Sequence, residues 1–165
     1  MASVDCAPQV AAALENPASV LSAAQRRALT ATPGYFPYGL PELRAAIAGM
    51  LTTRHGLPTR PEEVIVTTGA QQAVDLLIRC EVVPGQPVIT EDPTFPGTLD
   101  ALHRAGARPV GVPVGDIARL ERALAAHRPA MAYLIPTHHN PVGTSLPLGA
   151  RRRVAALASA DFHAQ

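Results

Sequence analysis

The sequence predicts an α/β fold in which a doubly wound, mostly parallel sheet lies between two layers of helices. From Glu63 onward, four short strand-like runs alternate with segments whose apolar residues recur at helical spacing, and the first of these runs is rich in β-branched residues. Glycine and proline residues mark most of the changes between them. This alternation is typical of right-handed βαβ units, and such sheets bind ligands beyond the carboxyl ends of their strands.

The first of these units is centred on the stretch Val64–Leu77. Its β-branched run Val64–Thr68 predicts a buried strand, Gly69 predicts a sharp turn, and the residues that follow predict a helix over Ala70–Val83. A helix that begins there directs unpaired N–H groups and the positive end of its dipole outward, which suits a phosphate. An ordinary strand-to-helix joint without a ligand would carry the same residues.

The chain before this unit is expected to be helical. Met1–Thr30 is rich in alanine and predicts one or two helices, and it shows no winged-helix DNA-binding pattern. A loop rich in glycine, proline and aromatic residues follows over Thr32–Pro41. Pro41 is suited to open a further helix, which we expect to end near Gly56 in a left-handed cap.

The remaining elements alternate in a regular order. We expect strands over Pro87–Glu91, Pro109–Pro113 and Ala130–Ile135, and helices over Gly97–Ala105, Ile117–His127 and Leu148–Ala160. The loops after the strands, Glu91–Phe95 and Pro136–Asn140 among them, hold many of the polar and aromatic loop residues. A ligand site is therefore expected at this edge of the sheet.

Composition excludes several classes of protein. Of 165 residues 47% are hydrophobic, which argues against a disordered chain, and a net charge of +1 gives no reason to expect binding to nucleic acid. No apolar run is long enough to span a membrane. The two cysteines, Cys6 and Cys80, lack metal-type spacing and fit a reducing, cytoplasmic setting. The fourteen basic residues are all arginine, so the chain has no lysine.

Four motifs, taken in this order, resemble the class I/II aminotransferases among the fold-type I pyridoxal phosphate (PLP) enzymes, and most closely the aminotransferase-like domain of MocR-type regulators. The motifs are Gly39–Arg44, Thr67–Ala73, Glu91–Gly97 and Pro136–Gly143. The resemblance covers about Tyr35 to Ala160. It implies, over residues 35–165, the partial PLP-binding large domain of a truncated PLP-dependent transferase. Residues 1–34 are expected to form a separate helical segment, from their alanine-rich composition.

The resemblance also implies roles for individual residues. Gly69, Ala70 and Gln71 would hold the cofactor phosphate, in agreement with the helix N-terminus expected there. Phe95 would stack on the pyridine ring, and Asn140 would donate a hydrogen bond to the ring's 3-hydroxyl. Considered alone, Phe95 could equally be a core residue, and Asn140 a turn residue before Pro141.

Further residues carry weaker implications. In the family, a tyrosine before the first motif reaches the phosphate of the partner subunit in a homodimer; Tyr38 is the candidate here, with Tyr35 as the alternative. His138 and His139 lack companion ligands for a metal. The run Arg151–Arg153 is expected to lie on a solvated helix face.

Some residues that the family's chemistry needs have no counterpart in the sequence. The family uses a lysine to bind the cofactor aldehyde and to move a proton, and an aspartate on a following strand to pair with the pyridine nitrogen. Asp161 comes too early in the chain for that aspartate. We therefore expect the sequence to be the amino-terminal part of a cofactor domain, inactive in transamination by itself.

Three functions remain open from the sequence. The first is an aminotransferase that acts on an amino acid and a 2-oxo acid, of which this is a partial chain. The second is a non-catalytic domain that senses PLP or another effector in a MocR-type regulator. The third is a plain doubly wound domain with a different phosphate ligand.

Overall fold

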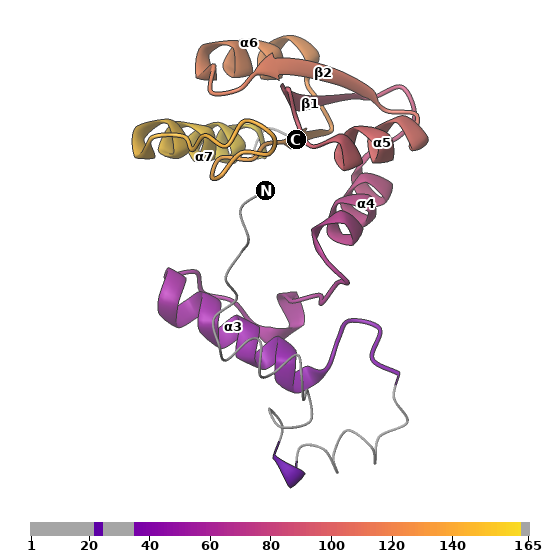
Figure 1. Cartoon of the computed structure of the whole chain (residues 1–165), viewed down its shortest axis with the longest axis vertical. Coiled ribbons are helices and arrows are strands. Elements are labelled where there is room, and N and C mark those ends of the chain that lie inside the picture. Colours follow the sequence, from indigo (N-terminus) through magenta and orange to yellow (C-terminus); the bar gives the residue numbers. More distant parts are fainter. Residues whose placement is uncertain (1–21, 25–34, 163–165) are drawn as a thin grey trace. The chain divides into compact units, whose positions relative to one another are not determined.

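The computed structural model describes residues 22–24 and 35–162 of the chain. The helices expected between Met1 and Thr30 lie largely outside these residues. The chain divides into two compact units, Met1–Val66 and Thr67–Gln165, and each is described by itself (Figure 1). Across the described part of the chain, no helix is long and apolar enough to cross a membrane.

Helix α3 (Pro41–His55) is the main element of the first unit and has the predicted bounds. Pro41 opens the helix, and the carboxylate of Glu42 lies in its first turn, where the dipole favours negative charge. Gly56 ends it in the left-handed conformation with φ +63°. The N–H of Leu57 then donates to the carbonyl of Leu51 at 3.1 Å.

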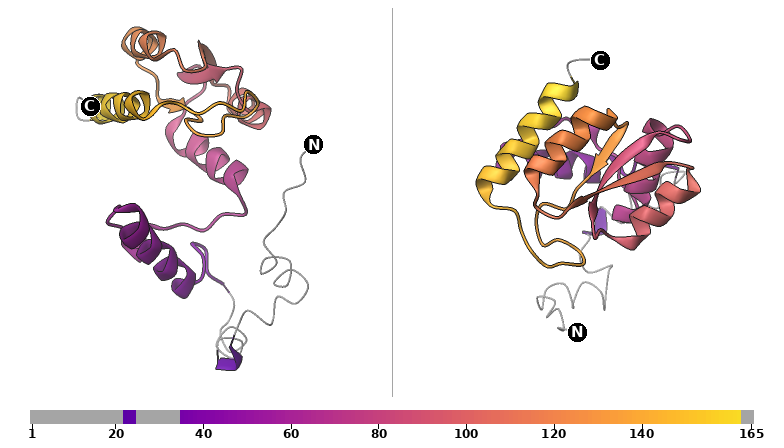
Figure 2. Two further views of the ribbon diagram at one scale, coloured as in Figure 1. Left: turned by 60° about the vertical axis from the view of Figure 1, so that its left-hand side comes forward. Right: turned by 90° about the horizontal axis from the view of Figure 1, so that it is seen from above.

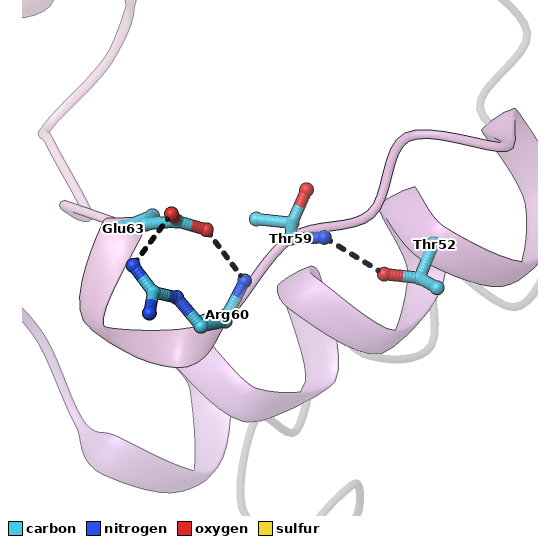
Figure 3. A network of polar contacts seen from close by, with 4 residues as sticks. All are labelled: Thr52, Thr59, Arg60 and Glu63. Atoms are coloured by element: carbon cyan, nitrogen blue, oxygen red, sulfur yellow. Dashed lines mark hydrogen bonds and ion pairs between the residues drawn. The ribbon is translucent and has the colours of Figure 1, made fainter.

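A short 3₁₀ helix, η2 (Pro61–Glu63), follows α3 and is tied to it by exposed polar contacts (Figure 3). The N–H of Thr59 donates to Thr52 Oγ1 at 3.1 Å, and Glu63 accepts from the N–H of Arg60 at 2.8 Å and from its guanidinium at 3.0 Å. These two hydrogen bonds, the backbone one first, hold the pKa of Glu63 below its usual value.

The prediction of a strand over Val64–Thr68 is wrong. These residues form no β-ladder, and their backbone groups are satisfied in other ways. The N–H of Val66 donates to the carbonyl of Tyr38 at 3.0 Å, and the carbonyl of Val64 accepts from Arg44 Nε at 2.8 Å. A β-branched run becomes a strand only where a neighbouring strand supplies partners.

The sheet of the second unit contains three parallel strands among the described residues, β1 (Pro87–Asp92), β2 (Arg108–Pro113) and β3 (Met131–Tyr133). Their order is β2-β1-β3, so β1 is central, and Thr90 lies opposite both Gly111 and Tyr133. The predicted strand at 130–135 is shorter than expected, because only Met131–Tyr133 pair with β1.

Four helices accompany this sheet in the alternation that the sequence predicts. Their observed ends differ from the expected ones by at most two residues: α4 (Ala70–Glu81), α5 (Pro96–Arg104), α6 (Ile117–His127) and α7 (Leu148–Phe162). Helix α6 begins after Asp116, whose side chain accepts a hydrogen bond from the N–H of Arg119 at 2.9 Å.

Adjacent residues of β1 build two separate cores, one on each face of the sheet. Val88 packs with Ile78, Val82, Ala101 and Leu102 of α4, α5 and the turn after α4. Ile89 packs with Val112 of β2 and Leu120 of α6, with Val154 of α7 at the margin. The sheet thus lies between α4 and α5 on one side and α6 and α7 on the other (Figure 2, right), which confirms the predicted three-layer α/β class.

Candidate functional site

The strand order places the carboxyl ends of β1 and β3 side by side. The chain leaves β1 through α5 to β2 on one side, and then crosses by α6 to β3 on the other side. The connections therefore diverge between β1 and β3, and the carboxyl ends of such strands leave room for a ligand. The loops that flank this point, Asp92–Phe95 and Leu134–Pro147, contain Phe95 and Asn140.

The N-terminus of α4 offers free backbone donors. Gly69 precedes the helix with φ +126° and ψ 172°, and no side chain caps it. The N–H groups of Ala70, Gln71 and Gln72 have no intrahelical acceptor, because they belong to the first turn. The carboxamide of Gln71 already donates to the carbonyl of Gly97 at 2.9 Å, so what this turn offers an anion is its backbone.

Phe95 lies against this helix N-terminus. It is the residue before α5, and its half-buried ring packs over Gly97. A Cβ on Gly97 would stand 2.6 Å from the Phe95 ring and 2.6 Å from Gln71 Oε1, so glycine is needed for these groups to meet. The hydroxyls of Thr94 and Thr98, on either side of Phe95, are buried without a hydrogen-bond partner among the described residues.

Asn140 lies in a loop that folds back on itself. The residue is exposed and precedes a cis peptide bond to Pro141. The N–H of Leu146 donates to the carbonyl of Pro136 at 2.9 Å, and the N–H of His138 donates to Ser145 Oγ at 2.9 Å. These bonds hold the two ends of the loop together and leave the Asn140 side chain at its tip.

Two buried residues, Glu91 and His139, lie together where the loop leaves β3. The sequence analysis did not assign them this role. Glu91, 5% exposed, accepts the N–H of Ile135 at 2.7 Å, and Nε2 of His139, a residue 2% exposed, lies 3.2 Å from the same oxygen. The available signal was an acidic residue at the carboxyl end of the predicted strand Pro87–Glu91, where ligand sites of such sheets lie. His139 and His138 form no group of three metal ligands with other described residues.

Other candidates lie elsewhere. Tyr35 and Tyr38 are exposed residues of the first unit, and the Arg44 guanidinium carbon stands 5.8 Å from the centre of the Tyr38 ring. Arg151–Arg153 are exposed on α7, and Arg153 Nε donates to Glu121 of α6 at 2.5 Å.

Comparisons of the sequence and of the structure with known proteins both point to aminotransferases. Residues 7–163 match the family of class I and II aminotransferases. The chain belongs to this family. A 2-aminoadipate transaminase of Thermus thermophilus is 40% identical over 127 residues, and a pyridoxine biosynthesis regulator of the helix-turn-helix type, PdxR of Corynebacterium glutamicum, is 33% identical over 144 residues.

A solved aminotransferase shares the fold. The α-aminoadipate aminotransferase LysN of Thermus thermophilus, crystallised with N-(5'-phosphopyridoxyl)-L-leucine, aligns over 93% of this chain with a TM-score of 0.74 and 35% identity. This chain spans 39% of LysN, 29% of the transaminase and 31% of PdxR. It therefore corresponds to about a third of these relatives.

The residues of this aminotransferase-family chain fit part of the family's cofactor, PLP. An uncapped helix N-terminus suits the phosphate, and Phe95 lies beside it through the shared contact with Gly97. The chain contains no lysine to hold the aldehyde. The fit is thus to the phosphate and the ring of the cofactor.

Proposed function

We propose that this chain forms the phosphate-binding and ring-stacking part of the PLP site of an aminotransferase, which moves an amino group between an amino acid and a 2-oxo acid. The observation that supports this most directly is the contact of Gln71 with Gly97, which brings the α4 N-terminus and Phe95 together. Neither an unpaired helix N-terminus nor a loop phenylalanine alone would indicate a phosphorylated aromatic ligand.

In this proposal each residue has a limited task. The backbone N–H groups of Ala70 and Gln71 hold the phosphate, while Gly69 leaves open space in front of the turn. Phe95 supports one face of the ring, and Asn140 donates to the 3-hydroxyl. Tyr38 would serve the partner's phosphate in a homodimer of the complete protein. When bound, the cofactor supplies the electron sink for amino transfer.

The test is direct binding of pyridoxamine 5'-phosphate to the 165-residue chain. This form has an amine in place of the aldehyde, so it cannot react with the N-terminal amine, and the chain has no tryptophan to disturb its fluorescence. We expect saturable binding, loss of binding for pyridoxamine without its phosphate, and about tenfold weaker binding for Phe95→Ala.

Leu77→Ala is the matched control, since this side chain is 53% exposed on α4, beyond the first turn. It should bind as the wild type does. Binding that Phe95→Ala and Asn140→Ala leave unchanged would favour a plain doubly wound domain with another phosphate ligand. No saturable binding at all would overturn the proposal.

We also propose that the chain by itself does not transaminate, because it contains no lysine. Amino transfer from an amino-acid donor to a 2-oxo acid should not exceed that of PLP free in solution. Turnover above that background, in proportion to chain concentration, would contradict this expectation.

A second candidate function is effector sensing in a MocR-type regulator. It is supported by relatives of the helix-turn-helix type, such as PdxR and the TauR protein of Rhodobacter capsulatus, which is 35% identical over 111 residues. Reading the gene on both sides of this segment separates the two functions. A winged-helix region encoded upstream favours the regulator, and a downstream frame with a lysine and no such region favours the enzyme.

A further inference from the structure

Glu91 is a buried acidic residue near the carboxyl end of β1, the strand that pairs with β3. It is 5% exposed, and its Oε2 accepts the N–H of Ile135, the second residue beyond β3, at 2.7 Å. Carboxylates are rarely buried unless they are paired or hydrogen-bonded, because burial removes their water. Here the compensating donor, the N–H of Ile135, belongs to the chain segment that leaves β3.

His139 supplies the second group that faces Glu91. Its Nδ1 accepts the N–H of Val142 at 3.4 Å, which leaves Nε2 on the side of Glu91. Nε2 stands 3.2 Å from Glu91 Oε2, which is its nearest described polar contact, although the pair lies outside hydrogen-bond geometry. The backbone of His139 is fixed as well, by its N–H to Thr144 O at 2.7 Å and its carbonyl to the N–H of Gly143.

These contacts set the position of the next residue, Asn140. No helix or strand covers residues 134–147. Leu134 packs against the core around Ile89, while the hydrogen bonds described for residues 137–145 join residues of the loop to one another. Glu91 instead connects the loop to the central strand. Phe95 follows Glu91 by four residues, just beyond the end of β1, so both groups that the proposed function places on the ring are connected to the carboxyl end of this strand.

We propose that Glu91 and His139 act as a positioning pair, which sets where the Asn140 carboxamide stands relative to Phe95 and thereby enables it to recognise a pyridine ring that carries a 3-hydroxyl. This inference rests on the proposed function. Glu91 and His139 touch no ligand in it; they act through the backbone on either side of Asn140.

A merely structural pair would have a different signature. If the contact only stabilises the fold, its loss should weaken the binding of both ligands to the same extent. If the contact positions Asn140, its loss should weaken the binding of the ligand that carries a 3-hydroxyl. The binding of an analogue without this hydroxyl should stay unchanged. The ratio of the two affinities is therefore the quantity to measure.

The experiment compares pyridoxamine 5'-phosphate with its 3-deoxy analogue on the 165-residue chain. We expect the wild type to prefer the hydroxylated ligand by about tenfold, as for a hydrogen bond to a charged group, and Asn140→Ala to lose this preference. His139→Asn cannot reach Glu91 and should lose it too. His139→Gln, whose amide reaches the position of Nε2, should keep most of it.

Glu91 provides an independent pair of variants. Glu91→Ala removes the acceptor and should abolish the preference, while Glu91→Gln keeps an acceptor oxygen and should retain it. Affinity for the 3-deoxy analogue reports folding in each variant and should stay near the wild-type value. Either pair decides the question, so a variant that fails to fold does not remove the test.

The outcomes separate this inference from the proposed function. If His139→Asn and Glu91→Ala keep the preference, or weaken both ligands equally, the pair is only structural and the inference is overturned while the proposed function stands. If Asn140→Ala keeps the preference, the role of Asn140 is wrong and the inference falls with it. If the wild type binds neither ligand, both proposals fail.

Discussion

The two compact units of this chain are stabilised by different kinds of contact. In the second unit, Val88 and Ile89 of β1 are fully buried and point into two apolar cores. In the first unit, the hydrophobic residues that are buried among those described are Ala48 and Val64, and polar contacts such as Arg44 to Val64 and Thr59 to Thr52 join its segments.

This difference matters because the two kinds of contact differ in strength. Burial of a large aliphatic side chain contributes about 1.5–3 kcal/mol, whereas exposed polar pairs contribute roughly 0–1 kcal/mol. We therefore expect backbone amides of β1 to be more protected from hydrogen exchange than those of α3. The proposed site draws its residues mainly from the better-packed unit, which favours fixed geometry.

The largest effect is expected for Leu102→Ala. Leu102 is fully buried between α4, α5 and β1, and its truncation leaves a cavity that should lower the free energy of unfolding by about 2–5 kcal/mol. Leu57→Ala is the matched control, since Leu57 is 56% exposed in the first unit. Denaturant unfolding measures both, and equal small losses would contradict the contrast between the units.

A smaller but sizeable effect is expected within the first unit for Gly39→Ala. Gly39 has φ +100°, and a Cβ there would stand 2.6 Å from Val66 Cγ2, so the strain should cost about 1–3 kcal/mol and reduce the protection of α3 amides. Gly49→Ala has the opposite expected sign, because Gly49 lies inside α3 with no atom near its Cβ position. Hydrogen exchange followed by NMR compares the two, and a neutral Gly39→Ala would show that the loop adapts.

The next effect concerns the N-cap of α6 in the second unit. Asp116→Ala removes the acceptor for the N–H of Arg119 and should lower stability by about 1 kcal/mol. Asp116→Asn keeps the cap and removes the ion pair with the Arg119 side chain at 3.3 Å. The thermal unfolding midpoints of the two variants separate the contribution of the helix cap from that of the ion pair. We expect the midpoint of Asp116→Asn to lie close to that of the wild type.

The smallest effect is expected for the exposed ion pair of α6 and α7. The hydrogen bond from Arg153 holds the pKa of Glu121 below its usual value of 4.5, so the pair stabilises the fold above that pH and is lost as the pH falls through the folded pKa. Glu121→Gln should be slightly less stable than the wild type near neutral pH and equal to it in acid. A constant difference across pH would contradict this assignment.

The local backbone at the candidate site was predictable from sequence. Gly69 before a helix and Phe95 before Pro96 follow from short motifs, and the structure brings their segments together. The Glu91–His139 contact joins residues 48 positions apart, and it depends on β1 and β3 being neighbours. Sequence patterns report local periodicity and do not show which strands are adjacent.

The sequence by itself determined the class of the fold, the helices of the second unit to within two residues, and the loops that hold the candidate ligand residues, because periodicity, capping and turn residues act over a few positions. Tertiary structure decided whether a β-branched run became a strand. Val64–Thr68 had its hydrogen bonds taken by Tyr38, Arg44 and Gln72, whereas Pro87–Asp92 found a strand on each side. Tertiary structure also brought Glu91 and His139 together, since this contact exists only where two segments distant in sequence pack against one another.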